Sequence, residues 1–218
     1  GNDFFRMVAP SKDMDAILDG LQSGKVSRFD VGLARFGGNE SYFVNLLGVG
    51  IDAEVLRRRE GFPRLKGLPQ YLAALVAALA SFRPVALEVE MEGISGREGK
   101  ETIRDRTILT AVTVGPSVGG GFLLSPEASP FDGLLDLFFA KTLGAVKLAR
   151  YIPMVIRGTH QGVPELVQRQ IQIGKVRRSD GESFLFEMDG ELMPNPVTSL
   201  EFEVCPKRLP VVGLEIAE

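Results

Sequence analysis

The sequence predicts a mainly β fold of the α+β class with a β-sandwich-like body, and two observations lead to this prediction. Many short runs alternate apolar and polar residues with a period of two, as residues 199–204 do around Glu201 and Glu203. This spacing is typical of strands with one buried face. Segments with helical spacing are fewer, and short strands that outnumber helices favour a sandwich or a related all-β body.

Four segments carry apolar residues at helical spacing. Pro10 separates the first two, with Ser11 as the expected N-cap of the second and Gly24 as its end. Pro84 ends the third, because proline cannot continue a helix. The expected helices are residues 2–8, 14–22, 71–82 and 143–156.

Strand-like alternation begins after the second helix. Gly37, Gly38 and Asn39 lie between the first two strands and predict the turn of a hairpin. The expected strands are residues 29–33, 42–46, 85–91, 107–114, 134–140, 170–176, 183–188 and 199–204.

Composition narrows the chemistry that the 218 residues can perform. The net charge of −3 offers no basic field for nucleic acid. The chain has one cysteine, Cys205, and one histidine, His160, so a zinc site or a catalytic Ser–His or Cys–His pair would depend on these two. A single cysteine suits a reducing cytosol. The longest apolar stretch, residues 71–82, is too short to cross about 30 Å of hydrocarbon as a helix. Acidic side chains are therefore expected to carry the chemistry.

Four segments stand out as motifs. They are residues 1–6 (Gly-Asn-Asp-Phe-Phe-Arg), residues 45–55, residues 119–136 with their glycine run and Asp-Gly pair, and residues 188–191 (Met-Asp-Gly-Glu). Each is weak alone, because Asp-Gly is a common turn dipeptide and glycine runs usually mark turns. In this order, the four together resemble the bacterial diacylglycerol kinase family, which is related to the sphingosine and ceramide kinases.

The resemblance covers essentially the whole chain and implies a domain organisation. The family has an ATP-binding α/β domain whose Gly-Gly-Asp-Gly-Thr motif lies upstream of the first segment, and this sequence does not contain that motif. The chain is therefore expected to be a fragment. Residues 1–25 would be a remnant of the N-terminal nucleotide-binding domain, with Asn2 and Asp3 facing the nucleotide cleft. Residues 26–206 would form a β-sandwich lipid-substrate domain, and residues 207–218 a tail that returns toward the N-terminal domain.

Asp189 and Glu191 are the expected catalytic residues. An alcohol that attacks a phosphoryl group must lose its proton, and a carboxylate can accept it. The resemblance places the family's Asp-Gly-Glu motif at residues 189–191 and leaves open which of the two acids is the base. Residues 180–182 have the same three letters but follow Arg177 and Arg178 in a polar turn, whereas residues 189–191 follow an apolar strand.

The resemblance also implies a Mg²⁺ site. Its ligands would be Asp132 together with oxygen atoms of Ser129 and Leu134, which suit a hard cation. Taken from the residues alone, this segment is a Pro-Asp-Gly-type turn before a strand. Both interpretations hold if the metal fixes the turn.

Substrate contacts are expected from two other segments. Residues 45–55 by themselves predict a strand that ends in a glycine turn, and in the sphingosine kinase relatives the acidic residue at the position of Glu54 contacts the lipid head group, with Asp52 nearby. Gly120 and Gly121 belong to a glycine run that lets the backbone approach substrate or a neighbouring domain. Family members often carry an asparagine shortly before this run, where this chain has residues 114–117, Val-Gly-Pro-Ser.

The function implied by the resemblance is Mg²⁺-dependent transfer of the ATP γ-phosphate to a lipid alcohol such as diacylglycerol. The location would be cytoplasmic, peripheral to the inner face of the membrane, with a homodimer possible. A basic cluster, Arg57, Arg58, Arg59, Arg64 and Lys66, is either a solvated face or a contact for anionic lipid. An NAD kinase-like phosphotransferase and a non-catalytic lipid-binding β-module are the alternatives. Because these residues contain no glycine-rich phosphate loop followed by a helix, they are expected to be inactive alone.

Overall fold

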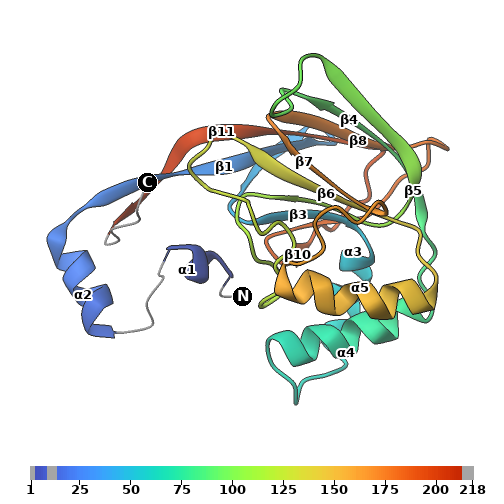
Figure 1. Ribbon diagram of the computed structural model, residues 1–218, viewed down its shortest axis with the longest axis horizontal. Coiled ribbons are helices and arrows are strands. Elements are labelled where there is room, and N and C mark those ends of the chain that lie inside the picture. The colour runs from blue at the N-terminus through green and yellow to red at the C-terminus, as the bar shows by residue number, and fades with distance from the viewer. Residues whose placement is uncertain (1–2, 9–13, 213–218) are drawn as a thin grey trace.

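The computed structural model describes residues 3–8 and 14–212 of the chain. In this part of the chain, eleven strands join one mostly antiparallel, curled sheet, which confirms the predicted mainly β fold (Figure 1). The strands are β1 (Val26–Phe36), β2 (Asn39–Phe43), β3 (Leu46–Gly50), β4 (Val85–Glu92), β5 (Lys100–Thr113), β6 (Leu135–Lys141), β7 (Leu166–Ile171), β8 (Ile173–Arg178), β9 (Phe186–Met188), β10 (Glu191–Leu192) and β11 (Ser199–Val212).

The sheet branches at β5. Its main path runs β10-β9-β3-β5-β4-β8-β11-β1-β2, and β6 pairs with β5 and then with β7 off this path. The first half of β5 pairs with β4, and its second half lies between β3 and β6. The turn that forms the first hairpin follows Phe36, which pairs with Asn39, so the predicted hairpin is present.

Two apolar clusters fill the two sides of this branch. One lies inside the curled sheet, and the other lies between β5, β6 and the helices. Strand β6 shows how both are filled: Leu137 and Phe139 point into the first cluster, and Phe138 and Ala140 into the second. Successive side chains of a strand point to opposite faces, so β6 is buried along almost its whole length.

Three helices cover the second cluster. They are α3 (Ile51–Arg59), α4 (Leu68–Leu79) and α5 (Ala145–Arg157), and they lie on one side of the sheet in Figure 1. Helix α4 begins with Pro69 in its first turn, a position where the missing N–H has no cost. Among the described residues, no helix is both long and apolar enough to cross a bilayer.

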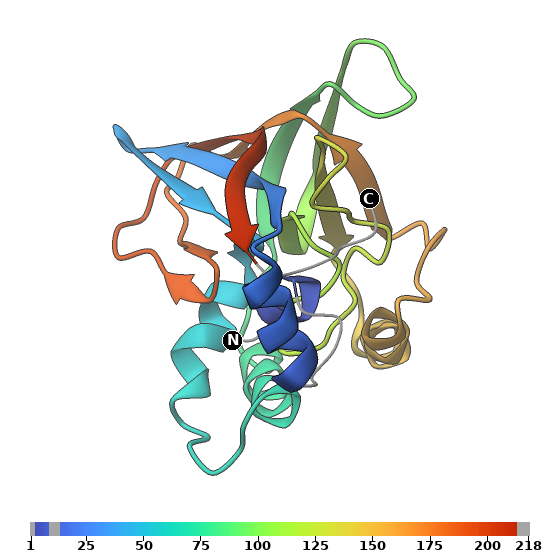
Figure 2. The same cartoon turned by 90° about the vertical axis from the view of Figure 1, so that its left-hand side faces the viewer.

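A long ribbon leaves the body of the molecule. Strands β1 and β11 pair from Val26 opposite Val212 to Phe36 opposite Leu200, with one irregularity near Phe29. Figures 1 and 2 show this ribbon reaching away from the helices toward α2 (Met14–Ser23), while α1 (Asp3–Val8) lies between α2 and the body. Ser11, the expected N-cap, lies outside the described residues.

Three sequence-based expectations about strands were wrong. Residues 42–46, expected as one strand, contain the end of β2 and the start of β3, with a bend at Val44 and Asn45 between them. Residues 45–55 form strand β3 and then helix α3, although the apolar residues at 51, 53 and 55 alternate as in a strand; all three are buried, as is Asp52 between them. Residues 170–176 belong to two strands, β7 and β8, because the chain changes partners at Gln172, whose backbone N–H donates to the carbonyl of Glu92. The last strand also extends beyond the expected residue 204, to Val212, through its pairing with β1.

Candidate functional site

A polar cleft of about 480 Å³ opens where β3, the β9–β10 turn, α1, α3 and α4 meet. Its walls carry four acidic residues from segments that are far apart in the sequence. The lining residues are Asp3, Phe4, Val44, Asn45, Leu46, Asp52, Leu56, Arg59, Gly67, Gln70, Tyr71, Val118, Gly119, Gly120, Glu187, Asp189 and Gly190.

Asp189 lies in the tight turn between β9 and β10, with a left-handed backbone at φ 50°. Its carboxylate accepts the backbone N–H groups of Val44, Asn45 and Leu46 at 2.8, 2.9 and 2.9 Å. Its own N–H donates to the carbonyl of Leu46 at 2.8 Å. These bonds hold the start of β3 against the turn, so Asp189 fixes this wall of the cleft.

Asp52 is positioned by a sharp change from strand to helix. Gly50 precedes α3 with φ 114°, and a Cβ there would come within 2.5 Å of the carbonyl oxygen of Ile108, so glycine is required. Asp52 follows in the first turn of α3, buried, and accepts the Tyr71 hydroxyl at 2.5 Å. Burial raises the pKa of the Asp52 carboxyl, while the Tyr71 hydrogen bond lowers it. Burial, together with the nearby Asp52 carboxyl, raises the pKa of Tyr71 well above its ordinary value.

Glu187 is a second buried acid, on β9. It is 1% exposed. One carboxyl oxygen accepts the backbone N–H of Gly190 at 2.8 Å, and the other, Oε1, has no hydrogen-bond partner among the described residues. Burial first, and then the charge of Asp52, raise the pKa of Glu187 well above its ordinary value.

An apolar cavity adjoins the cleft beneath α4 and α5. Asp52, Tyr71 and Val118 line both spaces, so they form the partition between them. The remaining walls of the cavity come from the second apolar cluster, including Leu75, Phe122, Phe138, Leu148 and Ile152.

Helix α1 closes the cleft on a third side. The carboxylate of Asp3, which is 7% exposed, accepts the N–H of Gly120 at 2.9 Å. Arg6 lies 3.8 Å from Asp3 and approaches Gly121, where a Cβ would meet its guanidinium at 2.9 Å. The structure therefore brings Asp3 and Gly120 into the cleft, while Gly121 is not among the lining residues. Asn2 lies outside the described residues.

Other expected site residues do not line the cleft. Glu191 is exposed on β10, and Glu54 forms ion pairs with Arg57 and Arg58 of its own helix at 3.4 and 2.6 Å. Asp180, in the second Asp-Gly-Glu, is exposed and paired with Arg178. His160 and Cys205 also lie outside the lining.

The segment expected to bind Mg²⁺ is a tight loop held by Asp30. The Asp30 carboxylate accepts the N–H groups of Gly133 and Lys207, both at 2.7 Å. Asp132 accepts the N–H of Leu134 at 2.9 Å, and its other oxygen lies 3.5 Å from Gln170. The loop thus joins β1, β7 and β11 to the start of β6.

One acidic oxygen near this loop has no hydrogen-bond donor or cation beside it among the described residues. Asp136 is buried, its Oδ2 has no partner among the described residues, and burial with the charge of Asp132 raises its pKa to about 7. Oxygen donors and an orphaned acidic oxygen fit a hard cation in kind. No three His, Cys, Asp or Glu residues of the described chain meet there, so backbone oxygens such as those of Ser129 and Leu134 would have to complete the shell.

Sequence reasoning missed Glu187, Tyr71 and Arg59 as cleft residues. For Glu187 a signal was present: it alternates with Phe186 and Met188 on a strand, so it points away from the core that they fill. Nothing in the sequence showed that a buried aspartate would face it. The sequence pattern indicated only that Tyr71 belongs to an apolar helix face and that Arg59 belongs to a basic cluster.

Comparisons with known proteins agree with this architecture. Residues 45–213, more than half of the chain, match the family described as the YegS C-terminal NAD kinase beta sandwich-like domain. A diacylglycerol kinase of Mycobacterium tuberculosis (strain H37Rv) is 29% identical over 168 residues, which are 76% of this chain and 52% of that protein. A diacylglycerol kinase of Bacillus subtilis (strain 168) is 28% identical over 192 residues, 87% of this chain and 59% of that protein.

A solved structure shares the fold. The crystal structure of a diacylglycerol kinase from Bacillus anthracis strain Sterne aligns with a TM-score of 0.65 at 16% identity, covering 98% of this chain and 63% of that one. The chain spans a little over half the length of the two curated relatives above. It belongs to the YegS C-terminal NAD kinase beta sandwich-like domain family.

Proposed function

We propose that the protein is a lipid kinase that transfers the γ-phosphate of ATP to the hydroxyl of a diacylglycerol-like lipid alcohol. The observation that carries this proposal is the junction between the polar cleft and the apolar cavity, where Asp52 and Tyr71 line both spaces. A lipid alcohol has the same two parts. A molecule with its acyl chain in the cavity would present its hydroxyl to the acidic cleft.

In this proposal the cleft residues have distinct roles. Asp189 is the acid of the Asp-Gly-Glu motif that lines the cleft, and it either accepts the hydroxyl proton or holds the β3 wall against which the lipid rests. Glu191 remains the other candidate base, although it is exposed outside the lining. Asp52 binds the polar end of the lipid, and Asp3 and Gly120 face the nucleotide. Glu54 would contact a head group only if its ion pairs with Arg57 and Arg58 open.

We extend the proposal to Mg²⁺ bound at the loop of Ser129, Asp132 and Leu134. When bound there, the ion neutralises the charge of Asp132 and fixes the loop that joins β6 to the ribbon. The orphaned Oδ2 of Asp136 supports a cation in this region.

A membrane-facing surface is also part of the proposal. Helices α4 and α5 cover the apolar cavity and expose Val76 and Val146, which are 66% and 86% exposed. Arg57, whose side chain is 61% exposed, belongs to the basic cluster and lies on α3, which packs against α4. Exposed apolar side chains next to basic residues suit peripheral contact with anionic lipid.

One experiment tests these assignments together. The full-length protein and residues 1–218 are assayed with radiolabelled ATP and Mg²⁺ against diacylglycerol, a sphingoid base, ceramide and NAD. We expect the full-length protein to label diacylglycerol or a related lipid and residues 1–218 alone to label nothing, because phosphoryl transfer depends on positioning both reactants. Labelling of NAD alone would replace the proposal by an NAD kinase activity, which the family description also suggests. No labelling by full-length protein that still binds lipid would indicate a binding module.

The metal assignment uses the same assay. Asp132→Ala should raise the Mg²⁺ concentration needed for half-maximal rate and remove the Mg²⁺-dependent rise in melting temperature. Asp180→Ala, which changes an exposed ion-paired aspartate, is the matched control. An unchanged Mg²⁺ response in Asp132→Ala contradicts the site.

A further inference from the structure

Two carboxyl groups converge in the cleft at the place that a side chain of Gly48 would occupy. Gly48 on β3 pairs with Glu187 on β9. A Cβ on Gly48 would lie 2.8 Å from Oδ2 of Asp52 and 2.9 Å from Oε1 of Glu187, so these oxygens are separated by no more than the sum of those two distances. Only the absence of a side chain at position 48 lets both acids occupy this place.

The two acids lack the partners that buried carboxylates usually have. Glu187 Oε1 has no hydrogen-bond partner among the described residues, and Asp52 is bonded only through its other oxygen, to Tyr71. Arg59 is the one cation in the described lining of the cleft, and it forms no ion pair with either acid at 4.0 Å or less. Both acids are at most 5% exposed and line the cleft. A buried oxygen without a partner beside a polar cleft has hydrogen-bonding capacity that a ligand could satisfy.

Their surroundings indicate how they share charge. Two like charges this close, and buried, do not both ionise readily, so such a pair tends to hold one proton. Asp52 has the Tyr71 hydroxyl and the first turn of α3 beside it, both of which favour an anion. Glu187 has neither, and burial and the Asp52 charge raise its pKa well above its ordinary value. The favoured arrangement is ionised Asp52 beside protonated Glu187.

We infer that Asp52 and Glu187 together form the site that recognises an uncharged, hydroxyl-bearing polar end of the lipid, with Glu187 as a hydrogen-bond donor and Asp52 as the acceptor. This inference rests on the proposed function and adds to it a specificity-determining residue, Glu187. Before phosphoryl transfer, the ionised carboxyl of Asp52 accepts a hydrogen bond from the lipid hydroxyl, which is released when the base takes that proton. The protonated carboxyl of Glu187 donates to a second oxygen, such as an ester carbonyl. Because Asp52 lies at the mouth of the apolar cavity, an acyl chain there brings the polar end to the pair.

The same pair discriminates against charged lipids. An anionic end, such as a fatty acid carboxylate or a phosphorylated product, meets the buried negative charge of Asp52, with which Arg59 in the described cleft lining forms no ion pair. An ammonium end could pair with the ionised Asp52, but it has no acceptor for the hydrogen bond of the protonated Glu187, so Glu187 would have to lose its proton. The site therefore selects an uncharged lipid over both.

The test measures binding by the full-length protein at neutral pH, using dioctanoylglycerol, dodecylamine and dodecanoate as probes. Wild type should bind dioctanoylglycerol most tightly. Glu187→Gln should bind it within about threefold of wild type, because an amide also donates a hydrogen bond. Asp52→Asn and Glu187→Ala should bind it about 10- to 100-fold more weakly, as expected when a hydrogen bond in a buried site is lost. Glu182→Gln, an exposed glutamate before the same strand, is the matched control and should be unchanged.

Melting temperatures of all variants establish whether each is folded. If Glu187→Ala is unfolded, the near-isosteric Asn and Gln variants still test the inference. The inference is overturned if Glu187→Gln binds as weakly as Asp52→Asn, if dodecylamine is the preferred probe, or if both near-isosteric variants match wild type. In the last case, continued phosphorylation of diacylglycerol by wild type leaves the proposed function intact. If wild type neither binds nor phosphorylates any lipid, the proposed function and this inference fail together.

Discussion

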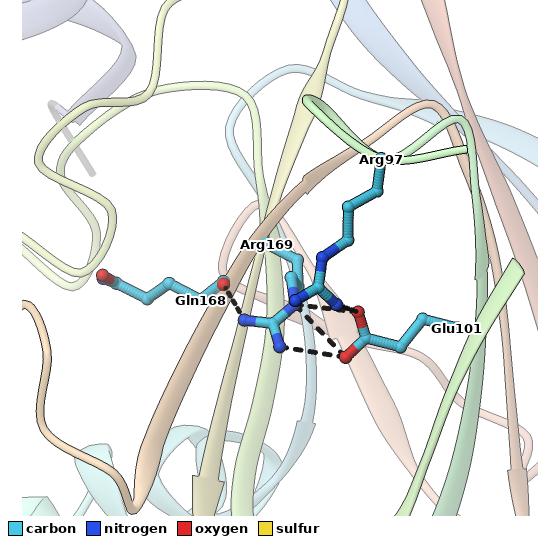
Figure 3. Close-up of polar contacts among 4 residues, drawn as sticks. All are labelled: Arg97, Glu101, Gln168 and Arg169. Carbon is cyan, nitrogen blue, oxygen red and sulfur yellow. Dashed lines mark hydrogen bonds and ion pairs between the residues drawn. The ribbon is translucent and has the colours of Figure 1, made fainter. Parts of the chain in front are cut away.

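Acidic residues occur in two contrasting settings in this protein. Several acids on strands away from the cleft are paired with arginines: Glu88 accepts from Arg104 at 2.9 Å and from Arg177 at 2.6 Å. These hydrogen bonds lower the pKa of Glu88 to about 2. Figure 3 shows a second example, in which the Glu101 carboxylate accepts hydrogen bonds from two guanidinium nitrogens of Arg169 and from one of Arg97.

The cleft has the opposite arrangement. Asp52 and Glu187 are as buried as Glu88, yet among the described residues neither has an arginine within ion-pair distance. The pKa of each is raised, whereas that of Glu88 is lowered. Burying charge without compensation destabilises a fold. The difference teaches that the strands use acids to stabilise the sheet, whereas the cleft retains acids that the fold alone does not need, as expected of a functional site.

The largest expected effect in the cleft is at Asp189. Asp189→Asn leaves one acceptor oxygen for three backbone N–H groups and points an NH₂ group at them. Loss of these bonds should lower the free energy of unfolding by about 1–3 kcal/mol. In the full-length protein the turnover rate should fall by about 10²–10⁴-fold, the usual contribution of a general base. Urea unfolding and the lipid phosphorylation assay measure the two effects.

Asp180→Asn is the matched control for this change. It alters the same residue type in the same three-letter sequence, but its carboxylate pairs with Arg178 on the surface. The turnover rate should be unchanged. Near-normal turnover by Asp189→Asn, or a large loss in Asp180→Asn, would show that the catalytic acid had been assigned to the wrong segment.

Glu187 should give the next largest effect, as a pH dependence of stability. Its folded pKa lies well above the ordinary value of 4.5, so the folded protein binds this proton more tightly than the unfolded chain does. The stability that protonated Glu187 contributes is therefore fully present below about pH 4.5. It falls as the pH rises toward the folded pKa, by at most about 1.4 kcal/mol per pH unit. Glu187→Gln removes this loss, so the variant should become more stable relative to wild type as the pH rises.

Urea unfolding of both proteins between acid and alkaline pH measures the difference. Asp52 contributes a change of the same sign, because burial also raises its pKa, so wild type and Glu187→Gln will both retain that part. A stability difference that does not vary with pH would mean that Glu187 is ionised in the folded protein, and the contrast with the arginine-paired acids would disappear.

The fold and part of the cleft could be predicted from the sequence because their signals are local. Period-two alternation predicted most strands, and an apolar strand before residues 189–191 separated them from the polar turn at residues 180–182. The structure places Asp189 in the cleft lining and Asp180 on the surface. Asp52 also reaches the cleft, although its segment was expected to be a strand and a turn.

The remaining parts depend on contacts between distant residues. Glu54 lies four residues before Arg58, a spacing that predicts an ion pair only if the segment is helical. Because the apolar residues at 51, 53 and 55 alternate like a strand, that helix was not expected. Glu187 joins the cleft through Gly48, which is far away in the sequence and becomes its neighbour only when β3 and β9 pair. Strand pairing of this kind cannot be deduced from one sequence.

The smallest expected effect is at Glu101, an arginine-paired acid on a strand. Its side chain is 23% exposed, and its partners Arg97 and Arg169 are 61% and 30% exposed, so solvent screens these pairs. Glu101→Gln should lower the free energy of unfolding by about 1 kcal/mol or less. Raising the salt from about 0.1 M to about 1 M shortens the Debye length from about 10 Å to about 3 Å, and most of the difference from wild type should vanish. Binding of dioctanoylglycerol should be unchanged, because Glu101 lies on β5 outside the cleft lining. Urea unfolding at both salt concentrations and one lipid-binding titration measure these effects. A loss of several kcal/mol that does not depend on salt, or weaker lipid binding, would contradict the prediction. Either result would show that the paired acids of the strands and the unpaired acids of the cleft do not have separate roles.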